Sequence, residues 1–116
     1  MSKLIKLLSE YGADVPGIME RFLNDEDLYN SCIHAFYEDN TFNDLGISIE
    51  TANYDDAFNY AHTLKGITGN MGLVPLYNLI VILVESLRSR DSSQINFQYK
   101  KIMDEYNKSK DLFYNK

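Results

Sequence analysis

The chain of 116 residues falls in the usual size range of one domain, and its 45% apolar and 24% charged residues are typical of a globular protein. A net charge of -6 leaves no excess of Lys or Arg to neutralise phosphates, which argues against a nucleic-acid binder or a protein of anionic membrane surfaces. The single cysteine, Cys32, excludes an internal disulfide and a Cys-rich zinc site. Residues 1–10 lack the apolar block of a signal peptide, and no stretch approaches 18 uninterrupted apolar residues. We therefore expect one domain over residues 1–116 and a cytoplasmic location.

Apolar residues recur at helical spacing from the N-terminus onward. A short helix is predicted over Ser2–Ser9 and a second over Val15–Leu23, where Asp14 and Pro16 supply an N-cap and a first-turn proline. Asp25 can cap a longer third helix, and the pattern allows a break anywhere between Asp39 and Asn43. The residues expected to face inward from this helix are Leu28, Cys32, Ala35 or Phe36, Phe42, Leu45 and Ile49.

Three further helices are predicted in the second half of the chain. Asn53 can cap a helix over Tyr54–Asn70, with Tyr54 on its inward stripe, and the following ones cover about Pro75–Ser89 and Ser93–Phe113. No segment shows sustained strand alternation. Short connections between long helices favour antiparallel neighbours, so the predicted fold class is all-α, an antiparallel up-and-down bundle.

The segment from Tyr60 to Leu73 carries the side chains with chemical potential. On a helix, His62, Lys65, Gly66 and Gly69 share one face. Two glycines inside a helix cost about 2 kcal/mol together relative to alanine, and close approach of another surface would offset that cost. A neutral imidazole is a good nucleophile near pH 7, and an ammonium one turn away can pair with phosphoryl oxygens. This face is therefore suited to phosphoryl transfer, which depends mainly on positioning and charge neutralisation.

The run Ala61-His62-Thr63-Leu64-Lys65-Gly66, followed by Gly72 and Leu76, resembles the signature of histidine phosphotransfer (HPt) domains. Weaker similarity covers nearly the whole chain, through Arg21–Asp25, Phe36, Asn53-Tyr54, Val84-Glu85 and Arg88. The resemblance implies a four-helix bundle over about 25–114, preceded by an N-terminal helical extension over about 2–23.

The same resemblance implies roles for four residues. His62 would accept a phosphoryl group from the aspartyl phosphate of one receiver domain and pass it to another. Lys65 would contact the phosphoryl group, while Gly66 and Gly69 would allow the receiver to approach closely. The magnesium ion of such transfers belongs to the receiver, so no cofactor or metal of the chain's own is expected.

The resemblance also implies the partners. They are receiver domains of response regulators and a hybrid sensor histidine kinase. The acidic net charge leads us to expect no nucleic-acid or membrane partner, and we further expect no small-molecule substrate and a monomeric chain. It is too short for an ATP-binding kinase domain and has no Gly-rich phosphate loop, so no autonomous kinase or other enzyme activity is expected. Two alternatives stay open, a receiver-binding scaffold without phosphotransfer and a structural bundle with an accidental His-x-x-Lys-Gly.

Several residues have two interpretations at this point. Gly69 is either a helix C-cap or a docking residue. Gly72 is interpreted as a turn glycine in preference to a contact residue. Tyr77, Val81 and Val84 form a second apolar row, which is either buried against the N-terminal helix or part of a docking patch. Cys32 and His34 are two residues apart and do not share a helix face, so they make a poor metal-ligand pair.

Overall fold

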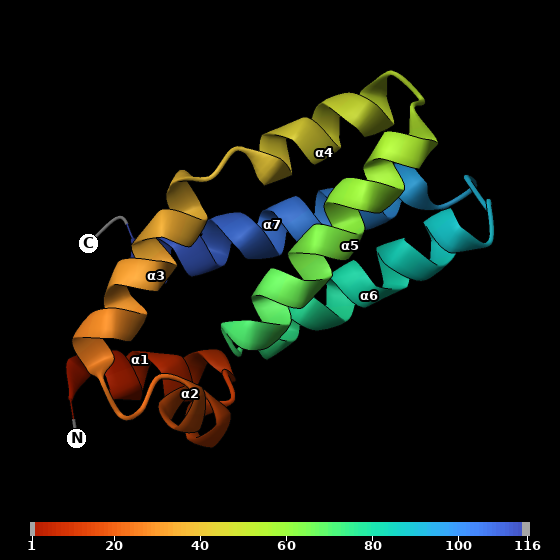
Figure 1. The fold of residues 1–116 in the computed structure, drawn as a ribbon. Helices are drawn as coiled ribbons and strands as arrows, with labels where there is room; N and C mark the ends of the chain where they lie inside the picture. The colour runs from red at the N-terminus through yellow and green to blue at the C-terminus, as the bar shows by residue number, and fades with distance from the viewer. Residues whose placement is uncertain (1, 115–116) are drawn as a thin grey trace.

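The computed structural model describes residues 2–114, and these form seven α-helices without a strand (Figure 1). In chain order they are α1 (Lys3–Tyr11), α2 (Val15–Arg21), α3 (Glu26–Glu38), α4 (Thr41–Glu50), α5 (Tyr54–Asn70), α6 (Val74–Arg88) and α7 (Ile95–Phe113). The all-α class is confirmed. There is one helix more than the six predicted, because the third predicted helix is divided in two.

Side-chain caps determine where the early helices begin. The Ser2 hydroxyl accepts the Ile5 amide (3.1 Å), which starts α1. The carboxylates of Asp14 and Asp25 accept the amides three residues later, at 3.2 and 3.0 Å, which starts α2 and α3. The two predicted aspartate caps are confirmed, and each satisfies a backbone amide that has no partner inside its helix.

The break between α3 and α4 lies at Asp39 and Asn40, inside the predicted window. Asp39 is extended (φ -76°, ψ 146°), and its carboxylate accepts the Thr41 amide at 2.8 Å. The carboxylate therefore satisfies an amide of the next helix, and this local capping interrupts an apolar pattern that continues across the break.

Helix α5 occupies the middle of the arrangement and packs along both α4 and α6. Helix α6 packs in turn along α7, and α7 also contacts α1, α3 and α4. Figure 1 shows α3 and α4 following one another along one side, with α1 and α2 at one end. The described part of the chain is elongated, with extents of 44 × 24 × 20 Å.

All seven helices contribute to one buried cluster. Leu8, Tyr11 and Ile18 of the N-terminal segment belong to the same core as the longer helices. The largest fully buried side chains are Tyr29, Leu8, Ile18, Ile33, Leu45, Leu64, Leu73, Leu76, Ile80, Leu83, Ile102 and Val84.

The inward face of α3 differs from the prediction. Leu28 is 46% exposed and Cys32 is half-buried, whereas Tyr29 is fully buried. Tyr54 of α5 is also exposed rather than inward-facing. The Tyr29 hydroxyl donates to the Met71 carbonyl (2.7 Å), so its polar atom is satisfied inside the core. That partner is 42 residues away, and the local spacing of apolar residues does not reveal it.

Candidate functional site

Helix α5 begins at a reciprocal cap and presents two different faces. The Asn53 side-chain oxygen accepts the Asp56 amide (3.3 Å), and its amide nitrogen donates to the Asp56 carboxylate (2.7 Å). Acidic residues in this first turn also suit the positive end of the helix dipole. Ala57, Ala61, Leu64 and Thr68 face the core, which leaves His62 on the outer face.

The other end of α5 is held by the N-terminal segment. Arg21 of α2 donates to the Asn70 carbonyl (2.9 Å) and to the Gly69 carbonyl (3.4 Å). The Leu73 amide donates back to the Thr68 carbonyl (3.1 Å). These bonds satisfy carbonyls that have no partner within a helix end. Both ends of the helix that carries His62 are therefore fixed by specific contacts.

The structure brings all four predicted site residues together. His62 and Gly66 are exposed, Lys65 and Gly69 are half-buried, and all four line one shallow depression. Asn70 and Tyr77 complete its lining, and Tyr77 comes from α6. The volume of about 280 Å³ is below the range of about 300–1,000 Å³ that is usual for small-molecule sites.

The two glycines of this face have different surroundings. A Cβ atom at Gly66 would meet no other atom within 4 Å. A Cβ atom at Gly69 would lie 3.2 and 3.4 Å from two ring carbons of Tyr77. Gly69 is not the helix C-cap, a place taken by Met71, so that interpretation is wrong. Packing beneath Tyr77 explains Gly69, whereas nothing within the described residues requires glycine at position 66.

Gly72 is confirmed as a turn glycine. Its φ of +69° lies in the left-handed region, and a Cβ atom there would come 2.7 Å from the Ile18 Cδ1 atom.

The three residues of the second apolar row on α6 differ in how far they are buried. Val84 is fully buried, while Val81 and Tyr77 are half-buried. Tyr77 is the member of that row that reaches the His62 depression.

An aromatic side chain supports the imidazole. The rings of Phe58 and His62 are stacked, with centroids 5.8 Å apart and an interplanar angle of 29°. The guanidinium of Arg88 lies over the Phe58 ring, 5.6 Å from its centroid. The four-residue spacing of Phe58 and His62 could have indicated the first contact, but the contact with Arg88 of α6 depends on tertiary packing.

The depression holds a nucleophile and a cation side by side. It combines one exposed imidazole with one ammonium, and no carboxylate lines it. A nucleophile without its own general base depends on a reactive, activated donor.

Within residues 2–114, no group of three His, Cys, Asp or Glu side chains is placed to hold a metal ion. His34 instead packs on the ring of Tyr114, with centroids 5.1 Å apart. No helix in the same described range is both long and apolar enough to cross a membrane.

Comparisons of the chain with protein-family models, with curated proteins and with solved structures find no match.

Proposed function

We propose that this protein is a phosphocarrier of a two-component multistep phosphorelay, with His62 as the phosphorylated residue. The observation that carries the proposal is the single face on which an exposed imidazole, an ammonium and a side-chain-free helix surface meet. Gly66 leaves open space beside His62, which suits a partner that must bring its own reacting group close to the imidazole.

The proposed fold is the four-helix bundle of HPt domains, with α4, α5, α6 and α7 as its helices. The contacts of α5 with α4 and α6, and of α7 with α6 and α4, support this assignment. Helices α1 and α2 would then be the N-terminal extension. The hydrogen bonds of Arg21 with the end of α5 give that extension a structural role.

The proposed transfer forms one bond and breaks one. A ring nitrogen of neutral His62 attacks the phosphorus of an aspartyl phosphate, the bond from phosphorus to the aspartate oxygen breaks, and the carboxylate leaves. Reversal on a second receiver returns the phosphoryl group to a carboxylate and restores the imidazole. Lys65 balances the negative charge of the phosphoryl oxygens while the group is on His62. The magnesium ion that assists such a step is a property of the receiver.

The proposed partners are response-regulator receivers and a hybrid sensor histidine kinase, and the proposed location is the cytoplasm. We propose that the carrier acts as a monomer without autonomous kinase activity. The second candidate is a scaffold that binds a receiver without accepting phosphate. It is favoured by the same open surface at Gly66, which would serve docking alone equally well.

The decisive experiment is phosphotransfer from radiolabelled, aspartyl-phosphorylated receivers to the wild type and to His62→Gln. We expect label on the wild type only, stable in alkali and lost in acid, as a phosphohistidine requires. His34→Gln is the matched control, because His34 lies against Tyr114 away from the depression, and this variant should be labelled like the wild type. Binding without label would leave the scaffold, and absence of both would overturn both candidates.

A further inference from the structure

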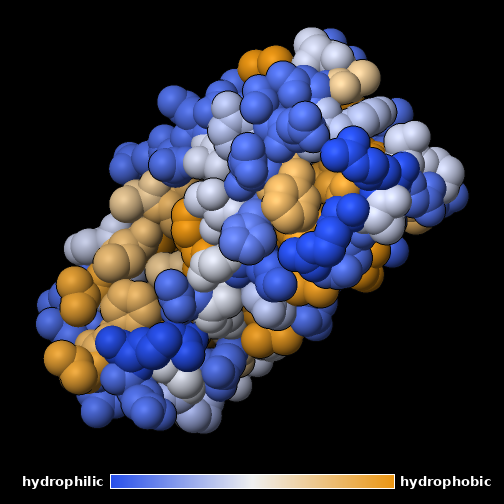
Figure 2. Space-filling view, turned by 45° about the vertical axis from the view of Figure 1, so that its right-hand side comes forward, coloured by the Kyte–Doolittle hydropathy of each residue, from blue (hydrophilic) through white to orange (hydrophobic). Residues whose placement is uncertain are grey.

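A second hollow lies on the same side of α5 as His62, toward the N-terminus of that helix. It has a volume of about 480 Å³ and is lined by Tyr54, Asp55, Phe58, Asn59, Leu87, Arg88, Arg90, Ser92 and Ile95. We call it the α5–α6 cleft. Figure 2 shows an apolar hollow bordered by strongly hydrophilic side chains on this face of the molecule. Its size and mixed lining are those of small-molecule sites, unlike the shallow depression at His62.

The apolar part of the cleft comes from three elements. Phe58 projects from α5, Leu87 from α6 and Ile95 from the start of α7. Leu87 and Ile95 are buried, and Phe58 is half-buried. Together they offer an apolar surface for a ring or a short hydrocarbon chain.

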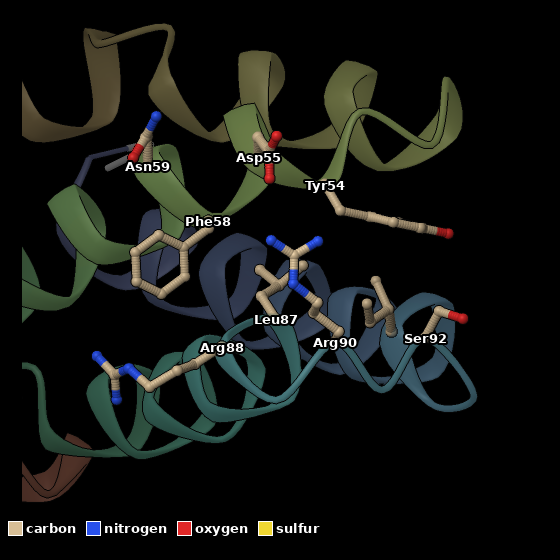
Figure 3. Close-up of a pocket in the computed structure, with 9 residues that line it drawn as sticks. Tyr54, Asp55, Phe58, Asn59, Leu87, Arg88, Arg90 and Ser92 are labelled. Carbon is tan, nitrogen blue, oxygen red and sulfur yellow. The ribbon is translucent and has the colours of Figure 1, made fainter.

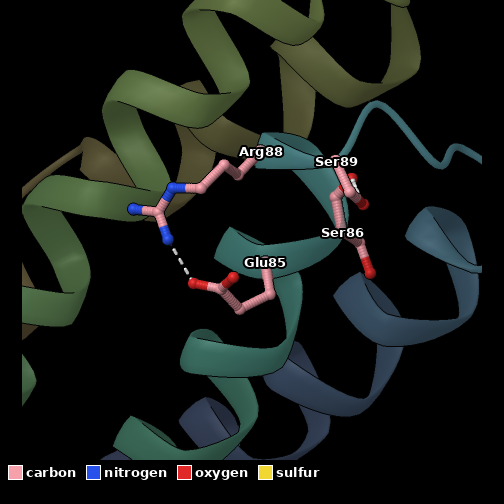
Figure 4. A network of polar contacts seen from close by, with 4 residues as sticks. All are labelled: Glu85, Ser86, Arg88 and Ser89. Carbon is pink, nitrogen blue, oxygen red and sulfur yellow. Dashed lines mark hydrogen bonds and ion pairs between the residues drawn. The ribbon is translucent and has the colours of Figure 1, made fainter.

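The charged part of the cleft is unusual for this chain. The protein has a net charge of -6 and only three arginines, at positions 21, 88 and 90, yet two of the three line this one cleft. Arg88 is paired with Glu85 (Figure 4), and its guanidinium also lies over the Phe58 ring. A cation held by two neighbours has little freedom to move toward a ligand.

Arg90 differs from Arg88, because its guanidinium makes no hydrogen bond or ion pair with any residue of the range 2–114. Figure 3 shows this guanidinium reaching between α5 and α6, toward Asp55. Arg90 also has a φ of +59°, a region that arginine seldom adopts. The turn after α6 therefore places an unpaired, strongly basic group at the mouth of an apolar hollow.

From this geometry we propose that the α5–α6 cleft binds a small amphipathic anion, with an apolar body on Phe58, Leu87 and Ile95 and a carboxylate on Arg90. The planar guanidinium of Arg90 matches the geometry of a carboxylate and can donate two parallel hydrogen bonds to it. Asp55 lies across the mouth and repels an anion, so it restricts the anionic group to the Arg90 side. This inference goes beyond the proposed phosphocarrier function and does not depend on it.

Phe58 connects the cleft with the candidate active site. Its ring lines the cleft and stacks on His62, so a ligand that contacts Phe58 changes the surroundings of the imidazole. His34, which packs against Tyr114 and is absent from the cleft lining, is an internal reference for the same measurement.

The test is an NMR titration of the full chain with 4-phenylbutyrate and, as the uncharged counterpart, 4-phenylbutanol. We expect saturable shifts of the Phe58, Leu87, Arg90 and His62 resonances with the acid, none at His34, and affinity about tenfold lower for the alcohol. Arg90→Gln should lower the affinity for the acid about tenfold, and Asp55→Asn should raise it. Lys108→Gln removes the same charge from an exposed residue outside the cleft and should change nothing.

Equal affinity for the two ligands, or an unchanged affinity in Arg90→Gln, would overturn the proposal. Absence of binding to the acid, with cleft resonances shifting only when a receiver protein is added, would also overturn it and assign the surface to a protein partner. Melting temperatures of each variant show whether the fold is retained. Phosphotransfer to His62 is measured separately, so failure of either proposal leaves the other intact.

Discussion

Gly66 and Gly69 lie three residues apart on the outer face of α5, yet only Gly69 has a neighbour that explains its lack of a side chain. The Tyr77 ring packs where the Gly69 Cβ atom would be, while the space at Gly66 is open. In a helix interior, glycine costs about 1 kcal/mol relative to alanine. The chain therefore carries a destabilising residue beside His62 without any benefit to its own packing.

Gly66→Ala should consequently raise the free energy of unfolding by about 1 kcal/mol, because the new methyl group meets no atom and the unfolded chain loses freedom. Urea denaturation followed by circular dichroism measures this. Gly69→Ala is the matched comparison and should gain less or lose stability, since its methyl group presses on Tyr77. A loss of stability in Gly66→Ala would contradict the open environment of this position. Under the proposed function, the same variant should slow phosphotransfer.

At the scale of elements, five of the seven described helices end in a residue with a positive φ, which is the C-cap itself in α1 and the residue after the C-cap in α2, α4, α5 and α6. The positive-φ residue is glycine at the ends of α1 (Gly12) and α5 (Gly72), but it is Leu23, Ala52 and Arg90 after α2, α4 and α6. The following amide then donates to the carbonyl five residues earlier, as Asn53 does to Ser48 (2.7 Å) and Asp91 to Ser86 (3.0 Å). Residues with a Cβ atom are strained in this conformation.

Ala52→Gly and Arg90→Gly should therefore each stabilise the protein by roughly 1 kcal/mol, a rise in melting temperature of about 4 °C. Thermal unfolding measures both. Only Arg90→Gly should also lose affinity for 4-phenylbutyrate, since Ala52 lies outside the α5–α6 cleft. A drop in melting temperature for both variants would show that the left-handed conformation of these residues is not strained.

Most helix boundaries could be predicted, because capping residues and apolar periodicity act locally. The bounds Tyr54–Asn70 agree with the structure, and Asp14, Asp25 and Asn53 cap as predicted. The inward face of α3 could not be predicted in the same way. Tyr29 and Tyr37 are buried because their hydroxyls donate to Met71 and Ser109, at 2.7 and 2.8 Å, and both partners are distant in the sequence.

In the candidate site, too, the features set by one helix could be predicted and those set by packing between helices could not. Helical periodicity alone placed His62, Lys65, Gly66 and Gly69 on one face, and the structure agrees. Tyr77 and Arg88 belong to α6, and their approach to α5 depends on how the two helices pack. The position of Arg90 depends on the turn after α6, which the sequence does not mark with a glycine.

At the scale of the whole molecule, buried tyrosines give the core a sensitivity to alkali. Burial raises the pKa of Tyr11, Tyr29 and Tyr37 above the ordinary value for a phenol. These groups stay neutral in the folded protein at a pH where they ionise, near 10, in the unfolded chain. The folded state then holds more protons than the unfolded state, so the stability contribution is complete below pH 10 and is lost above it.

We expect the urea midpoint to be nearly constant between pH 8 and 9.5 and to fall steeply above pH 10. Tyr37→Phe, which removes one buried phenol, should show a lower midpoint at pH 8 but a shallower fall above pH 10. The midpoint at pH 8 reports the loss of packing and hydrogen bonding in the variant, whereas the slope of the midpoint against pH above 10 reports ionisation of the buried phenols. Identical slopes in the two proteins would show that Tyr37 does not contribute to the alkaline transition.

The two turns that flank α6 differ in how well they should tolerate insertions. The α5–α6 turn is buried at Met71, Gly72 and Leu73 and is hydrogen-bonded by Tyr29 and by the Asp14 amide. Residues 89–94, between α6 and α7, are exposed throughout. Insertions are tolerated where backbone is exposed, so an insertion after α6 should cost less stability than one beside Gly72. Because that same loop carries Arg90 and Ser92, its length and sequence can change the cleft while the helix bearing His62 keeps its framework.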